Sequence, residues 1–179
     1  MKAGRLVLGL ALACSSCGWH AGLGAPAGAR SVGVEAATRD GHVLERGLEP
    51  LLTDALSHAV VDWVDLPLVS PEKADLVVRS KVLEYRRRGG VRNRDNELLE
   101  TAVFIRASAE LYDRGLGRPV GTAEQAQEWS GFALDDPSNE DAARVRALRQ
   151  VADALVLELF EPGSSAPKAP AEAAASAPR

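Results

Sequence analysis

The sequence predicts an α+β fold of two layers, in which a mixed or antiparallel four-stranded sheet carries two helices on one face. Apolar residues recur at helical spacing in two segments, 44–63 and 142–159. Alternation of apolar and polar residues, or short apolar runs, marks the predicted strands at 31–35, 76–87, 101–112 and 120–131. The predicted order of elements is therefore β-α-β-β-β-α.

The first helix follows the strand 31–35 and covers residues 44–63. Pro50 is unfavourable inside a helix because it has no amide hydrogen to donate. The helix therefore either begins near Glu49 or is kinked in its first turn. Its apolar stripe consists of Leu44, Leu48, Leu51, Leu52, Ala55, Leu56, Ala59 and Val60.

A short strand at 68–69 precedes the long strand 76–87. The apolar residues of the long strand change face: Leu76, Val78 and Val82 lie on one side, and Leu83 and Tyr85 lie on the other. This change of parity predicts either a β-bulge near Val82 or burial of the strand on both sides.

The clearest alternation lies in the strand 101–112. One face consists of Thr101, Val103, Ile105, Ala107, Ala109 and Leu111, and the other of Arg106, Ser108, Glu110 and Tyr112. A hairpin turn at 115–119 leads into the strand 120–131, which is polar on both faces apart from Trp129.

Asp135 and Asp136 stand just before the last helix, where carboxylates accept hydrogen bonds from the first amides of a helix. We interpret the pair as the start of that helix rather than as paired catalytic carboxylates. The apolar stripe of the helix consists of Ala142, Val145, Leu148, Val151, Ala152, Leu155, Val156 and Leu159.

The amino end has the pattern of a lipoprotein signal. Lys2 and Arg5 precede an apolar run at 6–13, which is too short to cross a bilayer, and small residues and cysteines follow. We predict a signal peptide at 1–16, acylation of Cys17 and a lipidated tether at 17–29. Neither Cys17 nor Cys14 has the leucine that usually stands three residues before the acylated cysteine, so the residues alone leave both open. Acyl chains would then hold the domain 30–161 on a membrane.

The spacing of the two cysteines also occurs in redox and metal sites, but such sites need a folded setting or a second pair of ligands. The segment 162–179 is rich in Ala, Pro, Gly and Ser, and we predict that it is a disordered tail.

Composition is that of one domain of ordinary size, and the motifs of the sequence do not indicate catalytic activity. The 179-residue chain has a net charge of −4 and 4% aromatic residues, which does not favour a nucleic-acid partner. No catalytic or phosphate-binding motif occurs, and His20, His42 and His58 lack ligand spacing, so we expect no enzyme activity, metal or other cofactor. An envelope enzyme is an alternative hypothesis, and it would require activity from a site with no visible nucleophile or metal.

Five arginines form the only site-like cluster: Arg86, Arg87, Arg88, Arg92 and Arg94. We expect them on a flexible loop over 86–96, around Gly89 and Gly90. The loop either serves solubility alone or binds anions, because guanidinium groups bind phosphates in a bidentate manner.

Several segments resemble the LptE family of lipopolysaccharide-assembly lipoproteins. The Cys-Gly-Trp-His sequence at 17–20 is similar to the start of that family, and 31–34 is similar to its first strand. Residues 74–86, with Ala-Asp followed by aliphatic residues and Tyr85, resemble a further strand of the family. The resemblance spans about residues 17–160 and includes the place of the final helix.

The resemblance implies a lipoprotein on the periplasmic face of the outer membrane, which plugs the lumen of the LptD β-barrel and supports export of lipopolysaccharide. A barrel lumen is polar, so a plug needs a polar sheet face, for which Arg79, Lys81, Arg106, Ser108 and Glu110 are the candidates. Gly18 in place of Asp after Cys17 favours outer-membrane sorting, and the five arginines are candidates for binding lipopolysaccharide phosphates. The alternative is an accessory lipoprotein of another envelope lipid-transport system of the ABC type.

Overall fold

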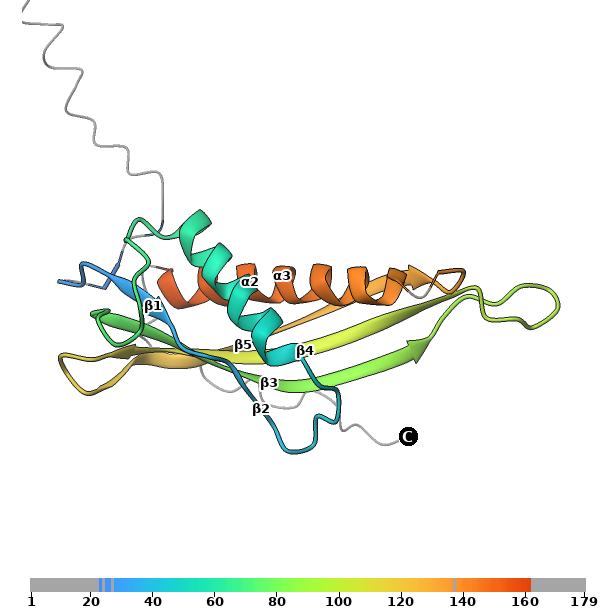
Figure 1. Cartoon of the computed structure of the whole chain (residues 1–179), viewed down its shortest axis with the longest axis horizontal. Helices are drawn as coiled ribbons and strands as arrows, with labels where there is room; N and C mark the ends of the chain where they lie inside the picture. The colour runs from blue at the N-terminus through green and yellow to red at the C-terminus, as the bar shows by residue number, and fades with distance from the viewer. Residues whose placement is uncertain (1–22, 24, 27, 137, 162–179) are drawn as a thin grey trace, which may run out of the picture.

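The structure is a computed structural model that describes residues 23, 25–26, 28–136 and 138–161. It shows one sheet covered on one side by two helices, so the predicted α+β class is confirmed (Figure 1). The elements are β1 (Val32–Val34), β2 (Thr38–Arg39), α2 (Leu48–Trp63), β3 (Leu76–Gly89), β4 (Glu100–Asp113), β5 (Arg118–Ala133) and α3 (Ser138–Phe160). The predicted signal peptide, Cys17 and the tail at 162–179 lie outside the described residues.

The sheet has five strands rather than the four expected. Its order is β1-β3-β4-β5, with β2 also paired to β3. Both short strands run parallel to β3, whereas β3, β4 and β5 are antiparallel. The predicted strand at 68–69 is reduced to one bridge between Leu68 and Val32. The sequence does not predict β2, because a strand of two residues is too short to show alternation. Only its pairing with β3 identifies it.

The first helix begins later than its apolar stripe suggests. α2 starts at Leu48, after Gly47 with a positive φ of 81°, so Pro50 lies in the first turn where its missing amide hydrogen costs nothing. Of the two expected arrangements, the late start is the one observed. Leu44 precedes the helix and is 87% exposed, so its assignment to the buried stripe was wrong.

The predicted bulge in the long strand is confirmed by a shift of register between Val82 and Glu84. The extra residue keeps both halves of β3 in register with β4 and turns Tyr85 toward the helices. The core lies between the sheet and the helices. Its largest fully buried side chains include Leu48, Leu52, Leu56, Leu76, Ile105, Leu111, Leu148 and Leu155.

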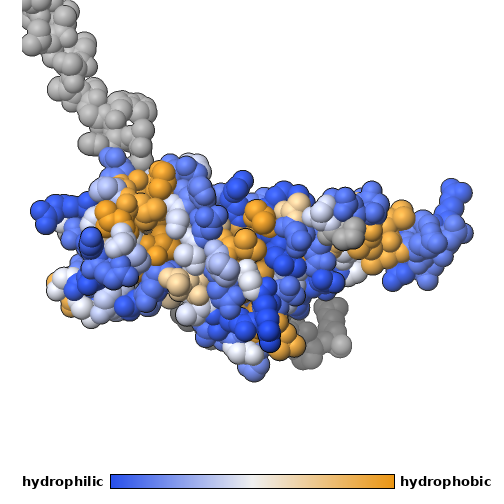
Figure 2. All heavy atoms as spheres, viewed as in Figure 1, coloured by the Kyte–Doolittle hydropathy of each residue, from blue (hydrophilic) through white to orange (hydrophobic). Residues whose placement is uncertain are grey.

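The hairpin between β3 and β4 extends beyond the helices (Figure 1). Arg86, Arg87 and Arg88 belong to β3, so the flexible loop expected over 86–96 was placed too early. The reason is pairing, because these arginines lie opposite Phe104, Val103 and Ala102 of β4. Hydrophobic residues gather at the base of the hairpin tip, and the tip itself is hydrophilic (Figure 2). Exposed apolar side chains at this end include Val91, Leu99 and Leu134.

The chain joins the fold at Leu23, within the predicted tether. The amide of Leu23 donates to the carbonyl of Trp63 at 2.7 Å, and its own carbonyl accepts from the amide of Asp65 at 3.4 Å. These two hydrogen bonds hold Leu23 beside the carboxyl end of α2.

Candidate functional site on the helix-free face of the sheet

The face of the sheet that carries no helix holds the polar residues predicted for it. The burial pattern of β4 alternates, with Ile105 and its alternate neighbours buried against the helices and Arg106, Ser108 and Glu110 on the other side. β3 contributes Arg79 and Lys81 to the same side, opposite Glu110 and Ser108 in register. We refer to this surface as the open face.

Ion pairs tie the open face of β3 to the segment that contains β1 and β2. Arg79 Nε donates to Glu35 Oε2 at 2.9 Å, and the Arg79 guanidinium lies 3.8 Å from the centre of the Tyr112 ring. Lys81 Nζ lies 3.0 Å from Asp40 Oδ2. The hydrogen bond from Lys81 and the amide of His42 lower the pKa of the Asp40 carboxyl below its usual value.

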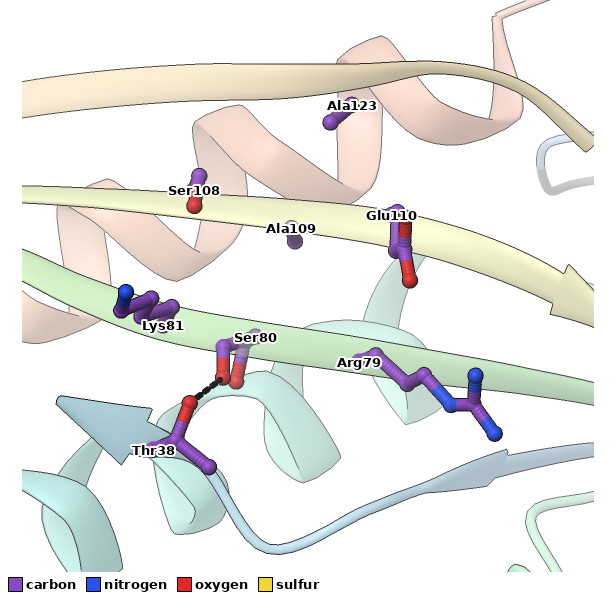
Figure 3. A pocket seen from close by; sticks show the side chains of 8 residues that line it. All are labelled: Thr38, Arg79, Ser80, Lys81, Ser108, Ala109, Glu110 and Ala123. Carbon is purple, nitrogen blue, oxygen red and sulfur yellow. Dashed lines mark hydrogen bonds between the residues drawn. The ribbon is translucent and has the colours of Figure 1, made fainter. Parts of the chain in front are cut away.

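A shallow hollow of about 260 Å³ lies between these two cations and β4. Figure 3 shows Arg79 and Lys81 along one strand and Ser108 and Glu110 along the next, with Thr38 at the border. The Thr38 hydroxyl donates to the carbonyl of Ser80 at 3.3 Å. Both cations already have carboxylate partners, so the hollow is polar and electrically mixed rather than a pure anion site.

A cluster of arginine and aromatic side chains occupies the hairpin half of the open face. The register places Arg86, Phe104 and Trp129 opposite one another on three neighbouring strands. Phe104 is only 4% exposed, although no helix covers it, because the Trp129 ring lies 4.5 Å away, centre to centre, and the Arg86 guanidinium lies 5.1 Å from its centre. Trp129 itself is 42% exposed. The sequence indicates Trp129 as the one large apolar residue of its strand but does not predict that it packs on Phe104.

Arg86 and Arg88, the two arginines that lie beside these rings, differ in whether they already have a carboxylate partner. Arg86 Nε lies 2.6 Å from Glu84 Oε1, and Arg106 binds the other oxygen of that carboxylate at 3.1 Å. The Arg88 guanidinium lies 5.6 Å from the centre of the Trp129 ring. Within the described part of the chain Arg88 has no ion pair, so it is the cation of the open face best placed to meet an external anion.

The structure does not bring the five predicted arginines into one site. Arg87 points to the helices, where its guanidinium lies 2.6 Å from Glu140 Oε1. Arg92 lies in the hairpin tip and donates to the carbonyl of Asn96 at 2.7 Å. Arg94 also belongs to the tip and has no ion pair among the described residues. The alternation of strand β3 separates Arg87 from Arg86 and Arg88, a division that a loop would not impose.

Asp136 acts at the start of α3 as expected, since its Oδ1 accepts from the amide of Ser138 at 2.8 Å. This hydrogen bond lowers the pKa of the Asp136 carboxyl. His58 lies 3.8 Å from the exposed Asp54 on α2. No group of three or more potential metal ligands occurs within residues 23, 25–26, 28–136 and 138–161. Over the same residues, no helix is both long and apolar enough to span a bilayer.

Comparison with known proteins gives similarity of fold alone. No protein-family model matches the sequence, and no curated protein matches it. A hypothetical protein from Chlamydia trachomatis is similar in structure, with a TM-score of 0.50 and 10% identity over 73% of this chain and 95% of that one. A protein from Xanthomonas campestris has a TM-score of 0.49 and 18% identity, over 72% and 81% of the two chains. A minor lipoprotein from Acinetobacter baumannii has a TM-score of 0.45 and 17% identity, over 73% and 90%.

Proposed function

We propose that this chain is a non-enzymatic, lipid-anchored subunit on the periplasmic face of the outer membrane, where it plugs an LptD-type β-barrel and supports export of lipopolysaccharide. The observation that carries the proposal is the open face. A sheet face without a helix normally needs a partner or a polar surface. Here it combines paired charges with an exposed aromatic side chain, which suits contact with a polar, structured surface.

The chemistry of the open face matches that of a barrel interior. The lumen of an outer-membrane barrel is lined by polar side chains. On the open face Arg79, Lys81 and Arg106 are each held by a carboxylate, and these pairs are accessible to solvent. Exposed ion pairs contribute little to the stability of the chain that carries them. They are therefore free to exchange partners with charged groups of a lumen at small cost.

The arginine and aromatic cluster supports contact with lipopolysaccharide. Its sugars carry phosphates, which guanidinium groups bind with two parallel hydrogen bonds. Arg88 beside the exposed Trp129 offers a charge with no competing carboxylate in the described structure. Arg92 and Arg94 in the hairpin tip extend the same charge beyond the end of the sheet.

Acylation at Cys17 would place the fold close to the membrane. Six residue steps separate Cys17 from Leu23, where the chain joins α2. An extended chain spans at most about 3.5 Å per residue, so the entry point would lie within about 20 Å of the anchor. Mass spectrometry of the mature amino terminus tests this part: an acylated Cys14, or an unmodified terminus further along, would contradict it.

Site-specific photocrosslinking in native membranes tests the partner. A photoreactive residue at Ser108 samples the open face, and one at Arg149 of α3 samples the helix layer as a matched control. We expect the Ser108 probe to capture a β-barrel outer-membrane protein and the Arg149 probe to capture none. Capture of an ABC-type transport subunit at Ser108 would instead support the alternative role as an accessory lipoprotein.

A charge-reversal experiment tests the ligand. Arg88→Glu with Arg92→Glu should weaken binding of lipopolysaccharide at least about tenfold at low salt, since each charge-assisted hydrogen bond contributes about 1.5–3 kcal/mol. The difference should shrink at high salt, and the melting temperature should stay nearly unchanged. Arg149→Glu makes the same kind of charge change on the helix layer and should bind like the wild type. Binding by the double variant at the wild-type level in low salt would restrict the proposal to a plug without a ligand site.

A further inference from the structure

The outer edge of β5 has a defined hydrogen-bonding pattern. β5 is the last strand of the sheet, and its inner edge pairs with β4. Just past the strand, the amide of Leu134 donates to the carbonyl of Leu99 at 3.0 Å, which fixes the alternation in this antiparallel pair. Even-numbered residues of β5 direct their main-chain groups to β4 along residues 124–132. Odd-numbered residues of the same stretch direct theirs outward.

Side chains of α3 cover one end of this outer edge. Arg146 donates to the carbonyl of Gly131 at 3.1 Å, and Asn139 donates through Nδ2 to the carbonyl of Ala133 at 3.2 Å. At the other end the register with β4 shifts, and the outer edge begins with Pro119 and with Gly121 at a φ of 76°. Both ends are therefore protected.

The middle of the edge lacks such protection. The outward amide and carbonyl groups of Gln125, Gln127 and Trp129 have no hydrogen-bond partner among the described residues. Natural edge strands are usually short, or carry lysine, proline or a bulge. Residues 123–131 contain neither lysine nor proline, and β5 is 16 residues long. The unpaired edge at 125–129 is thus able to accept another strand.

We propose that residues 125–129 pair antiparallel with the same segment of a second copy of this chain, about a two-fold axis at Gln127. An isologous contact of this kind brings identical surfaces together. Gln125 then lies opposite Trp129 of the second copy, and Gln127 lies opposite itself. On the helix side Glu124 lies opposite Ser130 and Glu128 opposite Ala126, so no like charges face each other.

The register argument favours a second copy over the other candidates for this edge. A second copy supplies an equally long strand whose uncharged side chains face one another on the open side. The chain's own residues 162–179 contain several prolines, which have no amide hydrogen for a strand ladder. The inference concerns the edge of β5 and does not rest on the proposed function, which uses the open face.

Disulfide trapping tests the register directly. In a hydrogen-bonded antiparallel pair, opposite Cα atoms lie about 5.5 Å apart, within the range for a disulfide. Full-length Gln127→Cys in its native membranes should therefore form a covalent dimer on mild oxidation. Gln125→Cys is the matched control, because its counterpart in the second copy would lie about 13 Å away along the strand. Wild type reports any contribution from Cys14 and Cys17. Equal trapping at both positions, or trapping of a different protein at Gln127, overturns the proposal.

Sedimentation of the detergent-solubilised full chain tests the association itself. Gln127→Pro removes only an outward amide, and edge strands tolerate proline there. We expect the variant to keep the wild-type melting temperature and to weaken dimerisation at least about tenfold. Gln127→Lys, which places two like charges opposite each other, should do the same by a different route. A wild-type chain that stays monomeric at about 100 μM overturns the proposal.

Discussion

Ile105 is fully buried at the centre of β4, between Tyr85 of β3 and Glu128 of β5. Ile105→Asp should unfold the domain, because a buried carboxylate without a partner costs several kcal/mol, which approaches the whole free energy of unfolding of a domain. Thermal melting followed by circular dichroism measures the effect.

Ser108→Asp is the matched control on the same strand. Ser108 lies on the open face opposite Lys81, so the new carboxylate meets solvent and a cation. We expect its melting temperature to differ little from that of the wild type. If Ile105→Asp melts like Ser108→Asp, the assignment of the two faces of β4 is wrong.

At the residue scale, alternation in the sequence predicted burial well inside elements and poorly at their ends. The pattern at 101–112 correctly separated the buried face from the open face. The first helical stripe was extended too far, since Leu44 lies before α2. Inside α3, Val145 is an exception, because it is exposed although it belongs to the predicted stripe. Spacing alone does not say where a helix begins. That point depends on features such as Gly47 and its positive φ.

The hairpin between β3 and β4 depends on a close approach at Gly90. A Cβ atom there would clash with the carbonyl oxygen of Glu100, which belongs to the backbone and cannot move aside as a flexible side chain could. Gly90→Ala should therefore shift the start of β4 and lower the free energy of unfolding by about 1–3 kcal/mol. Chemical denaturation measures the loss.

Gly89 provides a control one residue away. A Cβ atom on Gly89 would meet nothing within 4 Å. Gly89→Ala should change the free energy of unfolding by less than about 0.5 kcal/mol. Equal losses for the two variants would contradict the close packing at Gly90.

At the element scale, what the sequence could not supply was the partner of each strand. The sequence predicts a strand to about Arg87 and a loop over 86–96, so the arginine run falls where the two predictions overlap. It is a strand because Ala102, Val103 and Phe104 lie opposite and complete the ladder. The row formed by Arg86, Phe104 and Trp129 has the same origin. Its members are far apart in sequence, so only the register brings them together.

Tyr85 connects the sheet to α3, and its ionisation at alkaline pH should lower the free energy of unfolding of the whole molecule. Its hydroxyl donates to Glu140 Oε1 at 3.0 Å, and burial raises the pKa of the Tyr85 phenol above 10.0. The folded chain thus holds this proton more tightly than the unfolded chain. The contribution is complete below the unfolded pKa and is lost as pH rises through the folded pKa.

We therefore expect the free energy of unfolding to fall above about pH 10 in the wild type and to fall less in Tyr85→Phe. Denaturant titrations at a series of pH values, with phenol ionisation followed by absorbance, measure both quantities. An identical alkaline slope in wild type and Tyr85→Phe would show that another group is responsible.

At the scale of the molecule, periodicity was sufficient for the class of fold and for the side of the sheet that the helices cover. Periodicity did not predict that β1 lies at the edge of the sheet, beside β3. β1 and β3 are separated along the chain by α2, and nothing in either segment alone specifies the other as partner. Likewise the protection of one end of the β5 edge comes from two side chains of α3, which face it only in the assembled fold.

The parallel pairing of β1 with β3 also bears on the order in which the chain folds. β3, β4 and β5 follow one another along the chain as antiparallel neighbours, so their contacts are more local than those of β1, and we expect them to form early. We expect the β1–β3 ladder to form later, because it closes a much longer loop that contains α2. The first strand along the chain is thus expected to join the sheet after β3, β4 and β5. Until it does, residues 76–78 of β3 have no partner strand on the side that β1 will occupy.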